Sequence, residues 1–329
     1  MRFGLFIPQG WRHDLVDIEP AKHWSTMSSL AAAADAGPWE SIWVFDHFHT
    51  VPVPSTEATH EAWSLMAAFA ATTTRVRLGQ MCTCMSYRNP AYLAKVAGTV
   101  DSISGGRLEM GIGGGWYEHE WRAYGYGFPS AGERLARLDE GVQIMKQAWE
   151  TGTATLDGTH YQVDGALFYP QPAAGRIPLW IAGGGEKVTL RIAAKYADYT
   201  NFGINPEEFS HKSDLLREHC AAVGTDFDRI VRSMNHNTII GSTEAEVVDR
   251  IDAIEARLRP YLGAEKAADY VAYARSGDAV AVGTPEQVVE RLTDMRSRGL
   301  GYSIHNFAES AYDRSGIELF EREVVPALS

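Results

Sequence analysis

The chain has 329 residues and a mass of 36.2 kDa, which suits either two average domains or one large α/β barrel. Hydrophobic residues make up 45% and charged residues 22%, so the composition excludes a disordered, collagen-like or coiled-coil chain. The formal charge of −12 and the lack of a basic run argue against nucleic-acid binding, because an acidic surface repels phosphate.

Membrane and secretory features are also missing from the pattern. The apolar stretches are too short to span a bilayer, and the N-terminal segment lacks the basic region and long apolar core of a signal peptide. The three cysteines, Cys82, Cys84 and Cys220, have no CxxC spacing and form no disulfide framework. We therefore expect a cytoplasmic protein without a membrane or nucleic-acid partner.

Short apolar runs alternate with helical patterns along the chain. The first run ends at Pro8 and Gly10 and is typical of a strand that is buried on both faces. The predicted strands are 2–8, 41–46, 76–82, 108–112, 178–182, 198–202, 232–240 and 301–306. The predicted helices are 20–36, 62–73, 90–104, 117–150 with a break near 125–129, 186–196, 206–222, 243–258, 285–298 and 314–325. Eight such alternations predict a (β/α)8 TIM barrel, with a doubly wound open sheet as the alternative.

Two stretches interrupt this rhythm, at about 151–176 and 259–284. The first is rich in Gly, Thr and Tyr, and neither has the composition of a flexible linker. We interpret the chain as one domain over residues 1–329 that carries two insertions.

The active site of a barrel lies at the carboxyl ends of its strands. Asp46 and His47 end the second predicted strand, and a carboxylate beside an imidazole can hold a ligand N–H and move a proton. His47 and His49 would face the same side of an extended strand, as in metal-dependent hydrolases. We predict no metal, because no carboxylate or lysine stands where a bridging ligand is expected. A histidine bonded only to nearby backbone is the simpler alternative.

Two glycine clusters, Gly111–Gly115 and Gly183–Gly185, each follow a buried strand and precede a helix. Glycine lets a ligand approach the backbone closely, and a helix N-terminus offers free N–H groups to a phosphate. Lys187 follows the second cluster, where a cation would add to the attraction. The clusters predict a phosphate-bearing cofactor across the fourth and fifth strands, with tight turns as the alternative. Trp116, directly after the first cluster, is expected to face the pocket.

The remaining motifs point to a family. In chain order they are Phe3–Phe6 (FGLF), Val44–His47 (VFDH), Leu78–Cys82 (LGQMC), Arg88–Ala91 (RNPA), Gly105–Gly113 (GGRLEMGIG), Ile177–Gly184 (IPLWIAGG) and Gly283–Leu292 (GTPEQVVERL). Together they resemble the luciferase-like monooxygenase superfamily, and within it the coenzyme F420-dependent oxidoreductases. The match runs from residue 1 to about 205 and resumes at the last motif.

This resemblance implies a bacterial-luciferase-like TIM barrel that forms a homodimer and holds a flavin-like ring at its strand ends. It implies a cis peptide bond between Met81 and Cys82 behind the ring, and His47 as proton donor or ring-orienting residue. The residues that align with cofactor contacts are Asp46, Met81, Cys82, Cys84, Gly114, Gly115 and His119 near the ring, and Gly184, Gly185, Lys187 and Val188 at the phosphate end.

The expected function is hydride transfer between the deazaflavin C5 of F420 and a small organic substrate. An FMN-dependent monooxygenase of the same fold is the first alternative, followed by a flavin-binding protein without turnover and by a metal-dependent hydrolase that uses His47 and His49. The sugar-phosphate dehydrogenases of the family keep a glutamate where this chain has Trp116, and the chain has no evident basic cluster. The resemblance therefore does not extend to a sugar-phosphate substrate.

Overall fold

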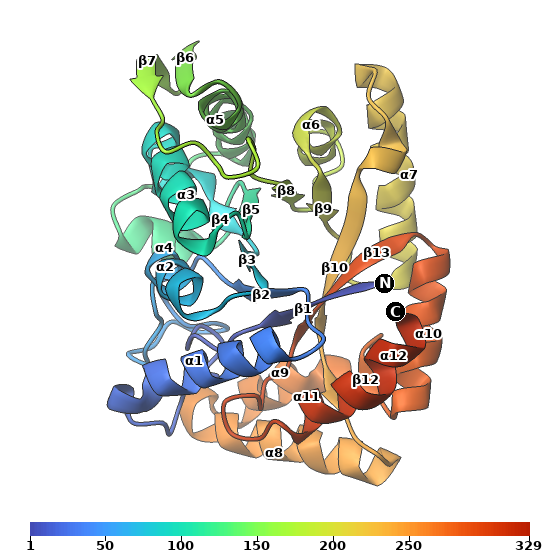
Figure 1. Ribbon diagram of the computed structural model, residues 1–329. Coiled ribbons are helices and arrows are strands. Elements are labelled where there is room, and N and C mark those ends of the chain that lie inside the picture. Colours follow the sequence, from blue (N-terminus) through green and yellow to red (C-terminus); the bar gives the residue numbers. More distant parts are fainter.

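The computed structural model describes residues 1–329 and contains a closed barrel of parallel strands surrounded by helices (Figure 1). The barrel strands are β1 (Arg2–Phe6), β2 (Ser41–Val44), β3 (Arg77–Gln80) with β4 (Thr83–Cys84), β5 (Leu108–Gly113), β8 (Leu179–Ala182), β9 (Tyr199–Asn201), β10 (Val231–Asn237) and β13 (Leu300–Asn306). Each barrel strand pairs with the next one in chain order. The last strand, β13, pairs with β1, and this pairing closes the sheet into a barrel. The TIM barrel is confirmed, and the open sheet is excluded.

Helices connect the strands on the outside of the barrel. Their bounds are α1 (Pro20–Ala36), α2 (Ala62–Thr72), α3 (Pro90–Ser104), α4 (Glu118–Ala123), α5 (Ala131–Thr151), α6 (Thr189–Tyr196), α7 (Pro206–Val223), α8 (Glu244–Leu262), α9 (Ala264–Arg275), α10 (Pro285–Ser297), α11 (Ser315–Leu319) and α12 (Val325–Leu328). Local sequence sets their ends. In α3, Asn89 accepts the first free N–H groups and Pro90 occupies the first turn, while Gly105 ends the helix at φ 68°.

The predicted elements differ from the observed ones mainly where a strand or helix is divided. The expected strand 232–240 ends at Asn237, because β11 (Ile239–Ile240) leaves the barrel and pairs with β12 (Val282–Gly283). The expected strand 76–82 ends at Gln80, and a separate short strand, β4, begins at Thr83 and pairs with the end of β5. The break in the helical region 117–150 is confirmed between α4 and α5.

Both predicted insertions lie between barrel strands. The first contains an antiparallel hairpin of β6 (Thr153–Asp157) and β7 (Gln162–Leu167) between β5 and β8. The second, between β10 and β13, is mostly helical: α8 continues to Leu262, and α9 packs against it in a separate apolar cluster that includes Ile254 and Val271.

The interior of the barrel is filled with aromatic side chains. Trp43 and Trp180 meet edge to face at 4.7 Å between ring centroids, and Trp180 stacks on Tyr199 at 4.1 Å. Trp43 and Trp180 are fully buried. No helix is long and apolar enough to cross a membrane.

Candidate active site

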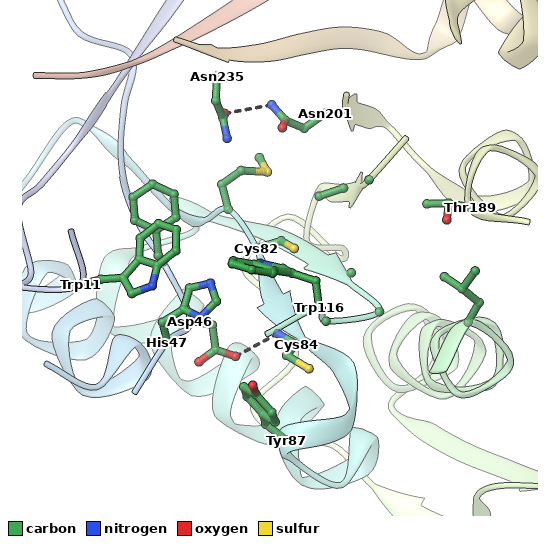
Figure 2. A pocket seen from close by; sticks show the side chains of 18 residues that line it. Trp11, Asp46, His47, Cys82, Cys84, Tyr87, Trp116, Thr189, Asn201 and Asn235 are labelled. Carbon is green, nitrogen blue, oxygen red and sulfur yellow. Dashed lines mark hydrogen bonds between the residues drawn. The ribbon is translucent and has the colours of Figure 1, made fainter. Parts of the chain in front are cut away.

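A cavity of about 380 Å³ lies at the carboxyl ends of the barrel strands (Figure 2). Half of its lining residues are hydrophobic, and the others supply glycine backbone, two amides, one imidazole, one carboxylate and one hydroxyl. The lining residues are Trp11, Phe45, Asp46, His47, Met81, Cys82, Cys84, Tyr87, Gly113, Gly114, Gly115, Trp116, Leu135, Ala182, Gly183, Thr189, Asn201 and Asn235. This volume and this mixture of surfaces are those of a small-molecule site.

The floor of the cavity is the upper layer of the aromatic barrel interior. Phe45, Met81 and Ala182 line the cavity and also belong to the apolar cluster that contains Trp43 and Trp180. A ligand in the cavity therefore lies on a rigid apolar surface and not above a water-filled channel.

Two contacts hold the imidazole of His47. The ring stacks on Trp11 with 4.2 Å between centroids and 3° between planes. Its Nδ1 lies 2.8 Å from a carboxylate oxygen of Glu120. The side chain is 12% exposed, and Nε2 has no protein partner. One ring nitrogen is thus anchored, and the other is available to a ligand.

Glu120, on α4, is completely buried and is surrounded by donors. Its carboxylate accepts the backbone N–H groups of Phe48 and His49 at 2.7 and 2.8 Å and the hydroxyl of Tyr87 at 3.2 Å. Burial acts to raise the pKa of Glu120, but the hydrogen bonds from His47 and from these N–H groups lower it below its usual value. An ionised carboxylate only accepts, so Nδ1 of His47 carries the hydrogen, and in the neutral ring Nε2 is the acceptor.

Asp46 lies in the cavity wall with its carboxylate engaged by protein groups. Arg88 donates to both oxygens, at 2.7 and 2.9 Å, and the backbone N–H of Cys84 donates at 2.9 Å. Arg88 also donates to Glu61 at 2.7 Å. The buried ion pair ties the end of β2 to the segment after β4, so Asp46 positions the cavity wall in addition to lining it.

The segment from Met81 to Cys84 forms the wall behind the cavity. The Met81–Cys82 peptide bond is cis, which confirms the expectation drawn from the resemblance. Burial, with a further contribution from the charge of Asp46, raises the pKa of Cys82 to about 12 and that of Cys84 well above its usual value. Both groups stay thiols at neutral pH, so they line the cavity without acting as nucleophiles.

Comparisons with known proteins assign the chain to a family. Residues 1–301 match the model of the luciferase-like monooxygenase family. The chain belongs to this family.

Several relatives are similar to this luciferase-like chain over different lengths. An F420-dependent glucose-6-phosphate dehydrogenase of Mycobacterium avium (strain 104) is 27% identical, over 91% of this chain and 92% of the relative. A pyrimidine monooxygenase of Stutzerimonas stutzeri (strain A1501) is 33% identical, over 50% of this chain and 46% of the relative. Among solved structures, an F420-dependent secondary alcohol dehydrogenase in complex with an F420-acetone adduct has a TM-score of 0.79 at 22% identity and covers 100% of this chain and 99% of its own.

The predicted site residues fall into two groups in this luciferase-like barrel. Those that line the cavity are Asp46, His47, Met81, Cys82, Cys84, Gly114, Gly115 and Trp116. Those that do not line it are His119, Gly184, Gly185, Lys187 and Val188. In the second group, His119 is exposed on α4, and the other four residues lie in the loop before α6, where Gly185, Lys187 and Val188 are exposed.

The loop before α6 is held from outside by α7. The ammonium group of Lys212 donates to the carbonyl oxygen of Gly184 at 2.7 Å and pairs with Glu208 at 3.0 Å. A Cβ atom on Gly184 would lie 2.7 Å from Nζ of Lys212. A side chain at Gly184 would therefore displace Lys212, and would not simply block the approach of a ligand to the backbone as the sequence suggested.

Several residues that shape the site have no distinctive sequence signal. Glu120 lies four residues after Trp116 in an ordinary helical pattern, and Arg88 stands out in the sequence only as part of the RNPA motif. Asn201 lies near the end of the predicted strand 198–202, but an isolated asparagine there indicates no particular chemistry. Asn235 lies within the predicted strand 232–240. A search for carboxylates facing the histidine from the neighbouring helix would have found Glu120.

His47 and His49 have different partners. Nδ1 of His49 lies 3.0 Å from Nδ1 of His119 at the exposed rim, whereas His47 pairs with Glu120. No group of three or more His, Cys, Asp and Glu side chains in residues 1–329 is arranged to hold a metal ion. The geometry therefore gives no support to a metal-dependent hydrolase.

Proposed function

We propose that this luciferase-like protein is a coenzyme F420-dependent oxidoreductase. A hydride would pass between the deazaflavin C5 of the bound cofactor and a carbon of a small organic substrate. The observation that carries the proposal is the pair of His47 and Glu120 at the cavity wall. It offers one ring nitrogen to a ligand while an ionised carboxylate holds the other at 2.8 Å.

The cavity suits a flat ring with an anionic side chain. Aromatic and apolar side chains form its floor, and the backbone of Gly113–Gly115 forms part of its wall. At Gly183, where φ is 120°, an added Cβ would meet only a methyl group of Thr189, at 3.4 Å, so the backbone there is accessible to a ligand. Gly183, Thr189 and the exposed loop with Lys187 would hold the phosphate end of the cofactor.

The residues of the chain then have separate tasks. When bound, F420 supplies the carbon that gives or accepts the hydride. Nε2 of His47 would give a proton to the substrate oxygen during reduction of a carbonyl, or take it during oxidation of an alcohol. Glu120 fixes the tautomer and stabilises the imidazolium form, and Trp11 keeps the ring plane in place.

The comparisons support F420 over FMN. The relative that matches over nine-tenths of the chain is F420-dependent, whereas the pyrimidine monooxygenase matches over half. An FMN-dependent monooxygenase remains the second candidate because the family model that matches the chain is described as luciferase-like monooxygenase.

Titration of the purified protein with F420 and, separately, with FMN tests the proposal. We expect saturable binding of F420, followed by its absorbance and by calorimetry, and much weaker binding of FMN. Tighter binding of FMN would replace the proposal with the monooxygenase, and binding of neither cofactor would refute both.

We also propose that the protein is a cytoplasmic homodimer. The dimer is what the family resemblance implies, and the compartment is supported by three free cysteines, two of them buried. Light scattering of the protein as it elutes from a size-exclusion column should give about twice the mass of one chain. A monomer mass at micromolar concentration would contradict the dimer.

A further inference from the structure

A second cavity, of about 480 Å³, adjoins the first along one wall. Asn201 and Asn235 line both cavities, so their side chains stand at the junction. No lysine or arginine lines either cavity. The carboxylate of Asp46 is paired with Arg88, and the remaining acidic residue, Asp278, belongs to the second cavity. The lining residues of the two cavities therefore place no lysine or arginine charge beside the two asparagines.

The hydrogen bonds around the two asparagines fix how each amide is oriented. The hydroxyl of Ser233 donates to the carbonyl oxygen of Thr200 at 2.7 Å, so its oxygen can only accept from Asn201. Nδ2 of Asn201 therefore faces Ser233, at 2.9 Å, and it also donates to Oδ1 of Asn235 at 3.0 Å. These hydrogen bonds leave Oδ1 of Asn201 and Nδ2 of Asn235 without protein partners.

The two free atoms form a donor and an acceptor side by side. Figure 2 shows the nitrogen of Asn235 and the oxygen of Asn201 turned the same way, away from the bond that joins the two residues. The register of the strands produces this arrangement, because Ser233 on β10 lies opposite Asn201 on β9 and Asn235 follows on the same face. The amides are held by strands, which makes the pair a rigid recognition element.

We propose that the Asn201–Asn235 pair binds a neutral amide edge of the substrate, in which an N–H group lies beside a carbonyl. The N–H would donate to Oδ1 of Asn201, and the carbonyl would accept from Nδ2 of Asn235. This inference rests on the proposed function and narrows its substrate class to carboxamides, lactams and imides. A carboxylate offers only acceptors, so it would face the oxygen of Asn201 unfavourably.

The pyrimidine ring of a deazaflavin carries a similar imide edge, so the test must separate the substrate from the cofactor. Benzamide, benzoate and benzamidine have nearly the same shape and differ in the donors and acceptors of one edge. We would measure their dissociation constants by calorimetry and ligand-observed NMR, on the cofactor-free protein and on the protein saturated with F420.

We expect benzamide to bind both forms of the protein, and benzoate to bind at least about tenfold more weakly. Asn235→Leu removes the donor and should weaken benzamide about five- to tenfold. Asn235→Asp presents an acceptor in place of the donor while Oδ1 still accepts from Asn201, so this variant should prefer benzamidine. Ser276 also lines the second cavity, so Ser276→Ala is the control and should leave the order of the three ligands unchanged.

Thermal unfolding and F420 affinity are measured for each variant, so that a folding defect is recognised. If Asn235→Leu folds poorly, the change of preference from benzamide to benzamidine in Asn235→Asp still tests the inference. Displacement of benzamide by F420 would assign the pair to the cofactor and overturn the inference, as would equal binding of benzamide and benzoate. If F420 binds and benzamide does not, only this inference fails. If benzamide binds and F420 does not, the proposed function fails instead.

Discussion

The chemistry of His47 depends on a carboxylate that lies 73 positions away in the chain. Glu120 reaches the imidazole from α4 and also accepts two backbone N–H groups from the segment after His47. These contacts keep Glu120 ionised in a buried place, because several donors compensate its desolvation. An imidazole with an ionised partner on Nδ1 is well suited to exchange a proton through Nε2.

Substitution of either partner should separate turnover from binding. His47→Ala should reduce turnover about 10²- to 10⁴-fold, because the proton donor or acceptor is lost. Glu120→Gln should reduce it about 10- to 100-fold, because Nδ1 no longer faces an anion. F420 affinity should change little in both, since the floor and the glycine backbone remain. Near-normal turnover of cofactor-saturated His47→Ala would remove the histidine from the mechanism, and Trp116 would be tested next.

The carboxylate of Glu120 should also make the free energy of unfolding depend on pH. The pKa of its carboxyl is lower in the folded chain than in the unfolded chain, so the ionised form stabilises the fold above the usual carboxyl range. That contribution is lost as the pH falls through the lowered value. The difference in unfolding free energy between the parent and Glu120→Gln, measured in urea, should therefore shrink from pH 7 towards pH 4. A difference that is constant with pH would contradict this account.

The helices α6 and α7 flank the glycine loop at 183–188 and determine which lysine near this loop can contact a ligand. Lys212 of α7 is tied to Gly184 and Glu208 and has little freedom to meet a ligand. Lys187 is exposed and forms no ion pair, so its charge is available to an anionic group. The two lysines therefore have different tasks, the first structural and the second electrostatic.

Variants at the two lysines should show this difference. Lys187→Met should lower F420 affinity about threefold at low ionic strength, with a difference that fades in high salt, and should leave stability unchanged. Lys212→Met should lower the free energy of unfolding by about 1 kcal/mol, because the partly buried carbonyl of Gly184 loses its donor. Lys266→Met, on the exposed face of α9, is the control for a lost charge. If Lys187→Met bound F420 as tightly as the parent protein at low ionic strength, the phosphates would lie elsewhere.

For the whole molecule, the aromatic interior of the barrel links stability to the site. Trp43 fills the centre, and a Cβ on Gly79 of the neighbouring strand would overlap its ring. The same cluster supports Phe45 and Met81 at the floor of the cavity. The barrel therefore closes around these rings, and the site lies on top of them.

Removal of this central ring should be costly. Trp43→Ala should lower the free energy of unfolding by about 3–5 kcal/mol, because closed strands cannot collapse to fill the space. Trp24 on α1 is 40% exposed, so Trp24→Ala serves as the matched control and should cost far less. Equilibrium urea unfolding compares the two. Equal losses would show that the barrel interior contributes no more than the surface.

The sequence by itself determined the barrel and most of the cavity wall. Buried strands leave continuous apolar runs, and helices leave a longer period, so β1, β5 and β8 are visible from their own residues. The rule that barrel sites lie at strand ends then selects His47, Trp116 and the glycine clusters. These signals are local, so a single sequence is enough to display them.

Only the tertiary structure decided which side chains meet. The pairing of His47 with Glu120 depends on where α4 lies against the end of β2, and the asparagine pair depends on the register that sets Ser233 opposite Asn201. The different roles of Lys187 and Lys212 depend on the position of α7, which brings Lys212 to the loop before α6. Apolar periodicity specifies which face of an element is buried, but a polar contact between distant elements requires a closed barrel with one register.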